Sequence, residues 1–236
     1  MLTLRDAGTG RATPVGAGGA IRLLISADGP GALTRLRALL IGDVLRRVAD
    51  VAGIRVIVAA DDRVPGREAL GIAPAYADPD AYAERADVTI GPGPWGAVRV
   101  GVGGLHVGGS PGVPPLATPF GDPGTDPAAL RLAMLSVPHD RDADLAAADL
   151  DAAEEELARW RGRVAAWAES PSRPMCAEHV ARFRTAFETG LDVPEALAVL
   201  RRVEDDRDVP PGSKFETFVF ADRVLALELP SAIGRA

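Results

Sequence analysis

The residues AIRLLISADGPGALTRLRALLIGDVLRRVADVAGIRVIVAA, 20–60, carry the clearest structural pattern in the chain. Two short apolar runs, 20–27 and 54–60, are typical of buried strands. Between them, residues 32–53 place apolar side chains at spacings of three and four, which predicts an amphipathic helix ending at Gly53. A strand, a helix and a second strand of this length predict a parallel pair joined by a crossover. The sequence therefore indicates an α/β core.

The pattern changes near residue 130. Before it, residues 78–91 predict a short helix and strand, and residues 97–109 predict one or two strands broken by glycines. After it, helical patterns follow one another, although residues 213–229 fit an extended, a helical or a mixed structure. We therefore expect an α/β half followed by a helical half.

Composition narrows the class of protein. The chain has 236 residues, 47% of them hydrophobic and 25% charged, which is ordinary for a soluble globular protein. Its net charge of -7 gives no general attraction for nucleic acid, so tRNA binding is not favoured. A single cysteine excludes a disulfide framework and any cysteine-based zinc cluster within one chain. Because no long apolar run or signal-peptide pattern is present, we expect a cytoplasmic protein without a membrane span.

Three short motifs could carry chemistry, and each has a plain structural alternative. The loop "DGPG" (28–31) could hold a phosphate through backbone N–H groups at the helix start, or be a turn that Asp28 caps. Asp61 follows a predicted strand, where α/β folds place their sites, but it also fits a surface loop. His106 lies among glycines that could approach a base closely, or it has a structural role.

Four sets of segments, in order along the chain, resemble cysteinyl-tRNA synthetases and their relative, the mycothiol cysteine ligase. They are "LTLRDAGTGRATPV" (2–15), "DVLRRVADVAGIRVIVAADD" (43–62), "DPAALRLAMLSVPHD" with "LDAAEEELARWRGRV" (126–140 and 150–164), and "FRTAFETGLDVPEALAVL" with "GSKFETFVFADRVLALEL" (183–200 and 212–229). The resemblance implies a Rossmann-like core of a class I aminoacyl-tRNA synthetase, expected over residues 1–130, and a helical domain, expected over residues 131–236.

The chain departs from this family where the family's chemistry lies. Asp28 stands where the family has a zinc-binding cysteine, and "GALTR" (31–35) has no histidine where the family has its His-Ile-Gly-His motif. Trp95 is the remaining counterpart of the Trp-His-Ile-Glu-Cys segment, and "HVGG" (106–109) resembles the His-Gly-Gly-Gly stretch. The Lys-Met-Ser-Lys-Ser loop is replaced by "FGDPGTDP" (120–127), which has no lysine.

These departures predict that the chain neither activates cysteine nor binds zinc. Amino-acid activation moves negative charge onto pyrophosphate, and the loss of one stabilising group costs on the order of 10²–10³ in rate. Arg35 and Arg37 could supply positive charge, but their helical pattern favours solvent-facing or packing roles.

Two functions remain open. The first is a pseudoenzyme that binds a partner protein or a small ligand, an ATP/AMP-type nucleotide or an aminoacyl-adenylate-like molecule, in the family's cleft. The alternative is a ligase or transferase that uses an already activated aminoacyl substrate. The candidate ligand-binding residues are Asp28, Gly29, Gly31, Asp61, Trp95, His106, Gly108 and Gly109.

Overall fold

Four parallel strands form the main sheet in the computed structural model, which describes residues 2–26, 31–60, 64–76, 78–91, 97–107 and 126–235. Its strands are β3 (Ala20–Ile25), β4 (Arg55–Ala60), β5 (Val88–Ile90) and β6 (Val98–Val100). They lie side by side in the order β4-β3-β5-β6, and every pair is parallel. The predicted strand–helix–strand unit is therefore confirmed.

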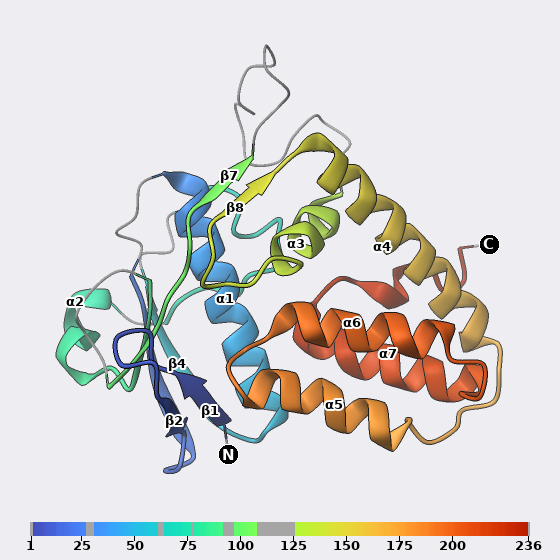
Figure 1. Cartoon of the computed structure of the whole chain (residues 1–236), viewed down its shortest axis with the longest axis horizontal. Coiled ribbons are helices and arrows are strands. Elements are labelled where there is room, and N and C mark those ends of the chain that lie inside the picture. Colours follow the sequence, from blue (N-terminus) through green and yellow to red (C-terminus); the bar gives the residue numbers. More distant parts are fainter. Residues whose placement is uncertain are drawn as a thin grey trace.

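Helix α1 (Ala32–Val51) lies at the centre of the molecule, between the sheet and the helices (Figure 1). Its central turns, residues 36–45, are buried all round, because the sheet contacts one side of the helix and α7 and β7 contact others. The chain leaves the helix through Gly53, whose φ of 72° is the left-handed conformation that glycine adopts without strain. The predicted helix end is confirmed.

Shorter elements complete the sheet-containing half. β1 (Leu2–Arg5) and β2 (Ala12–Val15) form an antiparallel hairpin, and β7 (Leu105–Val107) pairs in parallel with β8 (Ala143–Leu145). Helix α2 (Pro79–Tyr82), followed by the 3₁₀ turn η1 (Ala83–Arg85), packs against β3 and β4. Strand β8, which is three residues long, was not predicted.

The second half of the chain is helical, as predicted. It contains α3 (Pro127–Leu135), α4 (Ala147–Ala168), α5 (Ala177–Glu188), α6 (Val193–Asp205), α7 (Pro211–Leu225) and the 3₁₀ turn η2 (Leu229–Ala232). Of the alternatives for residues 213–229, the helix is correct for most of the segment. No helix within the described ranges is long and apolar enough to cross a membrane.

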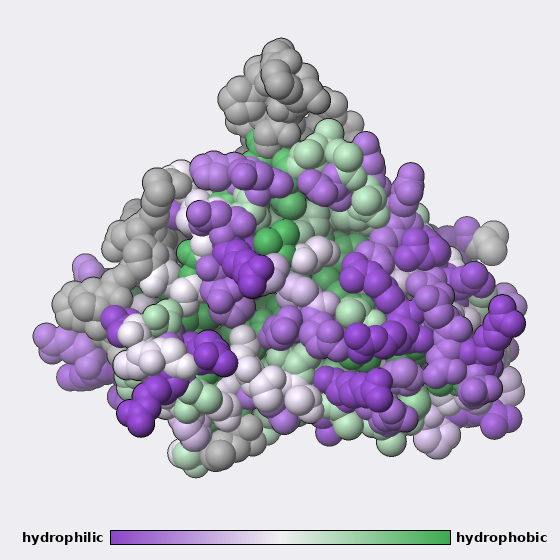
Figure 2. Space-filling view, in the orientation of Figure 1, coloured by the Kyte–Doolittle hydropathy of each residue, from purple (hydrophilic) through white to green (hydrophobic). Residues whose placement is uncertain are grey.

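The two halves share one apolar core. Trp160 and Trp167 of α4 meet Phe218 of α7 edge to face, with ring centroids 5.7 and 5.1 Å apart, and the same cluster of buried side chains continues into α1 and the sheet. On the face drawn in Figure 2, the outward-facing side chains of the helices are mainly hydrophilic. Residue 130, the predicted domain boundary, lies inside α3; the division into 1–130 and 131–236 stays a prediction.

A buried ion pair fixes α1 to the helical half. Arg131 of α3 donates to the Asp43 carboxylate of α1 at 2.9 Å, and both side chains are almost completely buried. Burial raises the pKa of Asp43, but Arg131, with Arg47 and Arg46, outweighs that effect and holds the pKa below its ordinary value. Arg131 also donates to the carbonyls of Leu70 and Leu225, so one side chain joins α1, α3 and the end of α7.

Candidate functional site

The candidate site lies where the chain reverses direction across the sheet. β4 and β5 follow β3 in the sequence but lie on opposite sides of it, and ligands of such sheets bind outside the carboxyl ends of the strands at this switch point. Here the ends of β3 and β5 approach closely, because Ser26 N–H donates to Ile90 O at 2.9 Å. Gly91 follows with a φ of 99°, and a Cβ at this position would lie 2.6 Å from Ser26 O. Glycine is therefore required at this strand end.

Helix α1 follows β3 in the chain, and Gly42 in the middle of the helix lies against Ile25 at the end of that strand. Gly31 is its N-cap residue, no side chain among the described residues caps the helix, and its first turn has no acidic residue. The first backbone N–H groups of a helix have no partner within the helix, and together with the helix dipole they attract anions. This arrangement can accept a phosphate or carboxylate group through backbone alone.

Strand β7 lies next to the same turn of α1. Leu105 N–H donates to Thr34 Oγ1 at 3.2 Å, which places β7 against the first turn of the helix. His106, one residue further, is exposed, and its register partner on β8 is Asp144. The structure thus brings Gly31 and His106 onto neighbouring elements.

Arg37 holds this region together from inside. Its guanidinium is completely buried and donates to five backbone carbonyls. Their oxygens belong to Gly103 (3.1 Å), Gly104 (3.2 Å), Arg141 (2.6 Å), Val137 (3.4 Å) and Pro138 (2.8 Å). Burial lowers the pKa of Arg37 from its ordinary value. We call this arrangement the Arg37 clamp; it joins α1 to the segments that lead into β7 and β8.

The sequence partly anticipated this role, because a packing position was one of the two roles expected for Arg37. The signal lies in its spacing, since Arg37 follows Leu33 by four residues and precedes Leu40 by three, on the apolar face of the helix. Asp43 sits on the same face, three residues after Leu40, and its ion pair with Arg131 was missed.

A polar hollow of about 350 Å³ lies beside Gly101, which directly follows β6. His139 lines it, with Nδ1 2.9 Å from Gly101 O and Nε2 3.1 Å from Gly190 O. Both ring nitrogens therefore face backbone carbonyls, one after β6 and one in the loop between α5 and α6. The histidine links the two halves of the chain and is half-buried.

Most of the predicted ligand-binding residues lie outside the described residues. These are Asp28, Gly29, Asp61, Trp95, Gly108 and Gly109. Their assignment as ligand-binding residues therefore stays a prediction. For Gly31 and His106 the structure gives the positions described above, but it shows no ligand contact.

The donors of a zinc site do not gather in the part of the chain that the structure describes. No three His, Cys, Asp or Glu side chains there are placed to hold a metal ion. Cys176, the sole cysteine of the sequence, is the N-cap residue of α5, and its backbone N–H contacts Thr217 of α7. The described residues thus do not fit the zinc of the synthetase family.

Comparison with known proteins gives a partial similarity to cysteine ligases. The L-cysteine:1D-myo-inositol 2-amino-2-deoxy-alpha-D-glucopyranoside ligase of Parafrankia sp. is 42% identical over 77 residues, and that of Streptomyces griseus is 42% identical over 79. The Thermobifida fusca ligase is 39% identical over 77 residues. These matches cover 33–34% of the chain but only 16–18% of the relatives. No family model matches the chain. The predicted resemblance to cysteine ligases is confirmed over about one third of the sequence.

Proposed function

We propose that this chain is a ligase-like binding protein, which holds a nucleotide or an aminoacyl-adenylate-like ligand at the switch point and does not activate cysteine. The observation that carries the proposal is the placement of three of its cationic or titratable side chains, Lys214, His179 and Arg37. Activation requires positive charge beside the pyrophosphate that leaves. In this chain these three side chains bond to other parts of the protein.

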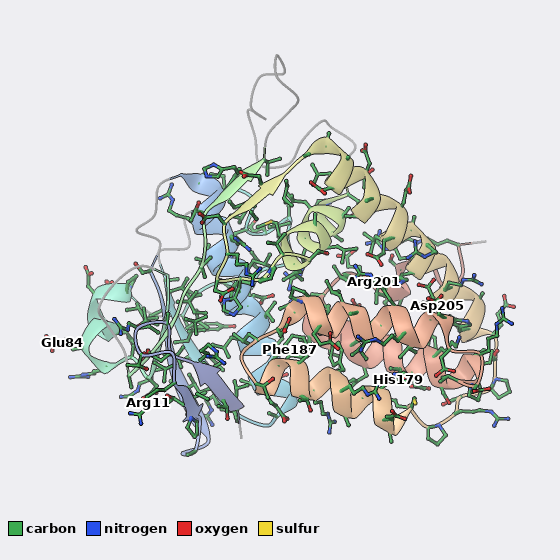
Figure 3. The ribbon with its side chains drawn as sticks, viewed as in Figure 1. Arg11, Glu84, His179, Phe187, Arg201 and Asp205 are labelled. Carbon is green, nitrogen blue, oxygen red and sulfur yellow. The ribbon has the colours of Figure 1, made fainter. Side chains whose placement is uncertain are left out.

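Lys214 is the single lysine of the sequence, and it is committed to the helical half. Its Nζ donates to Glu204 O at 2.7 Å and lies 5.6 Å from the centre of the Trp167 ring. His179 is bonded to Asp206 at 3.2 Å and lies at the end of α5 that points away from the sheet (Figure 3). These contacts support structural roles for both residues.

Arg37 is the buried arginine nearest to the start of α1, and its guanidinium is already bound in the Arg37 clamp. To reach a phosphate at the start of α1, its guanidinium would have to abandon the five carbonyls it now satisfies. A carbonyl oxygen left without a donor and away from water costs about 1–3 kcal/mol, and within the described residues only Gly104 O and Pro138 O would keep a backbone donor, from Ala143 and Arg141. This cost argues that Arg37 acts on the fold rather than on a reacting substrate.

Two backbone features support binding. Gly31 is the N-cap residue of α1 and Gly91 follows β5, and α/β folds hold phosphate groups at helix starts and at the carboxyl ends of strands. Binding through backbone N–H groups needs neither lysine nor histidine, which is consistent with the composition of this chain.

The decisive experiment measures binding and activation separately. Titration calorimetry with AMP and with a non-hydrolysable cysteinyl-adenylate analogue should detect binding, whereas ATP–pyrophosphate exchange with cysteine should give no signal. Exchange activity would contradict the non-catalytic role. Turnover of a preformed aminoacyl adenylate without ATP would favour the alternative, a transferase that uses an activated substrate.

A charge placed at the start of α1 locates the site. Ala32→Glu puts a carboxylate in the first turn, where it favours the helix dipole but repels a phosphate. We expect binding to weaken at least about tenfold, a change of roughly 1.4 kcal/mol, with folding stability unchanged or raised. The matched control is Ala147→Glu at the first residue of α4. Equal affinity in both variants would show that the ligand does not bind at α1.

A further inference from the structure

We propose that a cavity at the C-terminal end of α1 is a second ligand site, which binds an apolar α-amino acid. The cavity has a volume of about 130 Å³. It lies between β1, the end of α1, α5 and α7, and its lining residues are Leu2, Val48, Val51, Ala52, Phe183, Arg184, Phe187, Glu188, Phe220 and Val224. The 20 residues of α1 separate it by about 30 Å from the switch point, so it is independent of the function proposed above.

The inner wall is apolar and well packed. Leu2, Phe183 and Phe187 are each 1–2% exposed. The Phe183 ring meets Phe187 and Phe220 edge to face, with centroids 5.0 and 6.1 Å apart. An engineered cavity of about 150 Å³ with such a lining stays dry and binds benzene. The space here therefore suits an apolar body of that size, such as the side chain of leucine or phenylalanine.

The rim carries two opposite charges with no ion-pair partner among the described residues. Arg184 and Glu188 both line the cavity, and they are exposed and one helical turn apart on α5. The Arg184 guanidinium carbon lies 5.3 Å from the centre of the Phe220 ring, which holds the positive charge against the cavity wall. Phe187, another wall residue, lies at the opposite end of α5 from His179, on the side toward α1 (Figure 3).

Together, the apolar wall and the two charged rim residues favour a zwitterion with an apolar side chain. Arginine offers paired N–H donors to a carboxylate, and a glutamate accepts hydrogen bonds from an ammonium group. In an amino acid these two groups share one carbon atom, so two charges one helical turn apart can meet both while the side chain enters the cavity. A molecule lacking either charge leaves one rim residue without a partner.

The test is titration calorimetry of the full chain with L-leucine and L-phenylalanine. We expect 4-methylpentanoate, which lacks the ammonium group, and isopentylamine, which lacks the carboxylate, to bind at least tenfold more weakly than leucine. Equal binding of all three would overturn the proposal and leave an apolar void only. No detectable binding of either amino acid would overturn it as well.

Variants separate the rim from the rest of α5. Arg184→Gln and Glu188→Gln should each weaken leucine binding at least tenfold, and Ala52→Leu, at the exposed mouth, should abolish it. Arg182→Gln and Glu178→Gln are the matched controls, because they remove an exposed ion pair of 2.7 Å on the same helix that does not line the cavity. Controls that weaken binding as much as the rim variants would contradict the site. Leucine binding that survives Ala32→Glu separates this result from the fate of the switch-point proposal.

Discussion

The two ends of α1 are held in opposite ways. Toward its start, Arg37 bonds to backbone through five carbonyls, and in the sheet Asp6 likewise accepts the N–H groups of Thr9 and of Arg99 in β6. At its other end, apolar side chains surround a cavity, and the charges of Arg184 and Glu188 have no ion-pair partner in the described ranges. Charge committed to backbone stabilises the fold, whereas uncommitted charge beside an apolar cavity is available to a ligand.

Of the changes that test this comparison, removal of the Arg37 guanidinium should have the largest effect on the free energy of unfolding. Arg37→Met supplies an apolar side chain of similar length but removes the guanidinium donors to five carbonyls of half-buried or exposed residues, so we expect the free energy of unfolding to fall by roughly 3–5 kcal/mol. Urea denaturation measures it. The control is Arg35→Met, which changes a partly exposed arginine two residues away on the same helix and should cost less than about 1 kcal/mol. Similar losses in both variants would mean that the clamp does not support the fold.

The clamp also shows which parts of the fold a sequence reveals. Helix α1 and strands β3 and β4 were predicted because their apolar periods extend over many residues. The same period places Arg37 on the buried face, but its acceptors lie 66–104 residues away, so no local pattern identifies them. Strand β8 was not predicted, because its three residues lie between helical patterns and its pairing partner β7 lies 38 residues earlier in the chain.

The candidate site was predictable only in its position. A parallel strand–helix–strand unit directs attention to the loops after its strands, and the structure places the switch point there. The requirement for glycine at position 91 arises from Ser26 O, 65 residues earlier in the chain, and could not be read locally. The cavity at the other end of α1 could not be predicted from the sequence either. Its volume depends on how β1, α1, α5 and α7 pack together, and no single segment shows this.

The pKa of Asp6 allows a test of intermediate size, because it makes the stability of the fold depend on pH. Hydrogen bonds from the backbone N–H of Arg99 and from Thr9 lower the pKa of Asp6 from 3.8 to about 2. A carboxyl group with a lowered pKa stabilises the fold above pH 3.8, and this contribution is lost as the pH falls toward 2.

We therefore expect Asp6→Asn to lower stability by about 1–2 kcal/mol at pH 7 and to approach the unaltered chain in stability near pH 2. Chemical denaturation at several pH values measures the difference between the two proteins. Asp50→Asn is the control, since that carboxylate is exposed on α1 and bonds to no described residue. A difference between Asp6→Asn and the unaltered chain that does not change with pH would show that the Asp6 charge is not held as described.

The prediction with the smallest expected effect tests whether unoccupied space exists beside Val48, near the C-terminal end of α1. Val48 lines the cavity, whereas Val44, one turn earlier on the same helix, is completely buried in packed core. Val48→Ile adds a methyl group where space exists and should raise the free energy of unfolding by up to about 0.8 kcal/mol. Val44→Ile adds the same group to a filled interior and should lower it by about 1–3 kcal/mol. Opposite signs for one chemical change would show that the packing differs between the two positions, while a loss in both would mean that no space is free beside Val48. Because the added methyl occupies volume that a leucine side chain would need, Val48→Ile should also weaken leucine binding, whereas Val44→Ile should not.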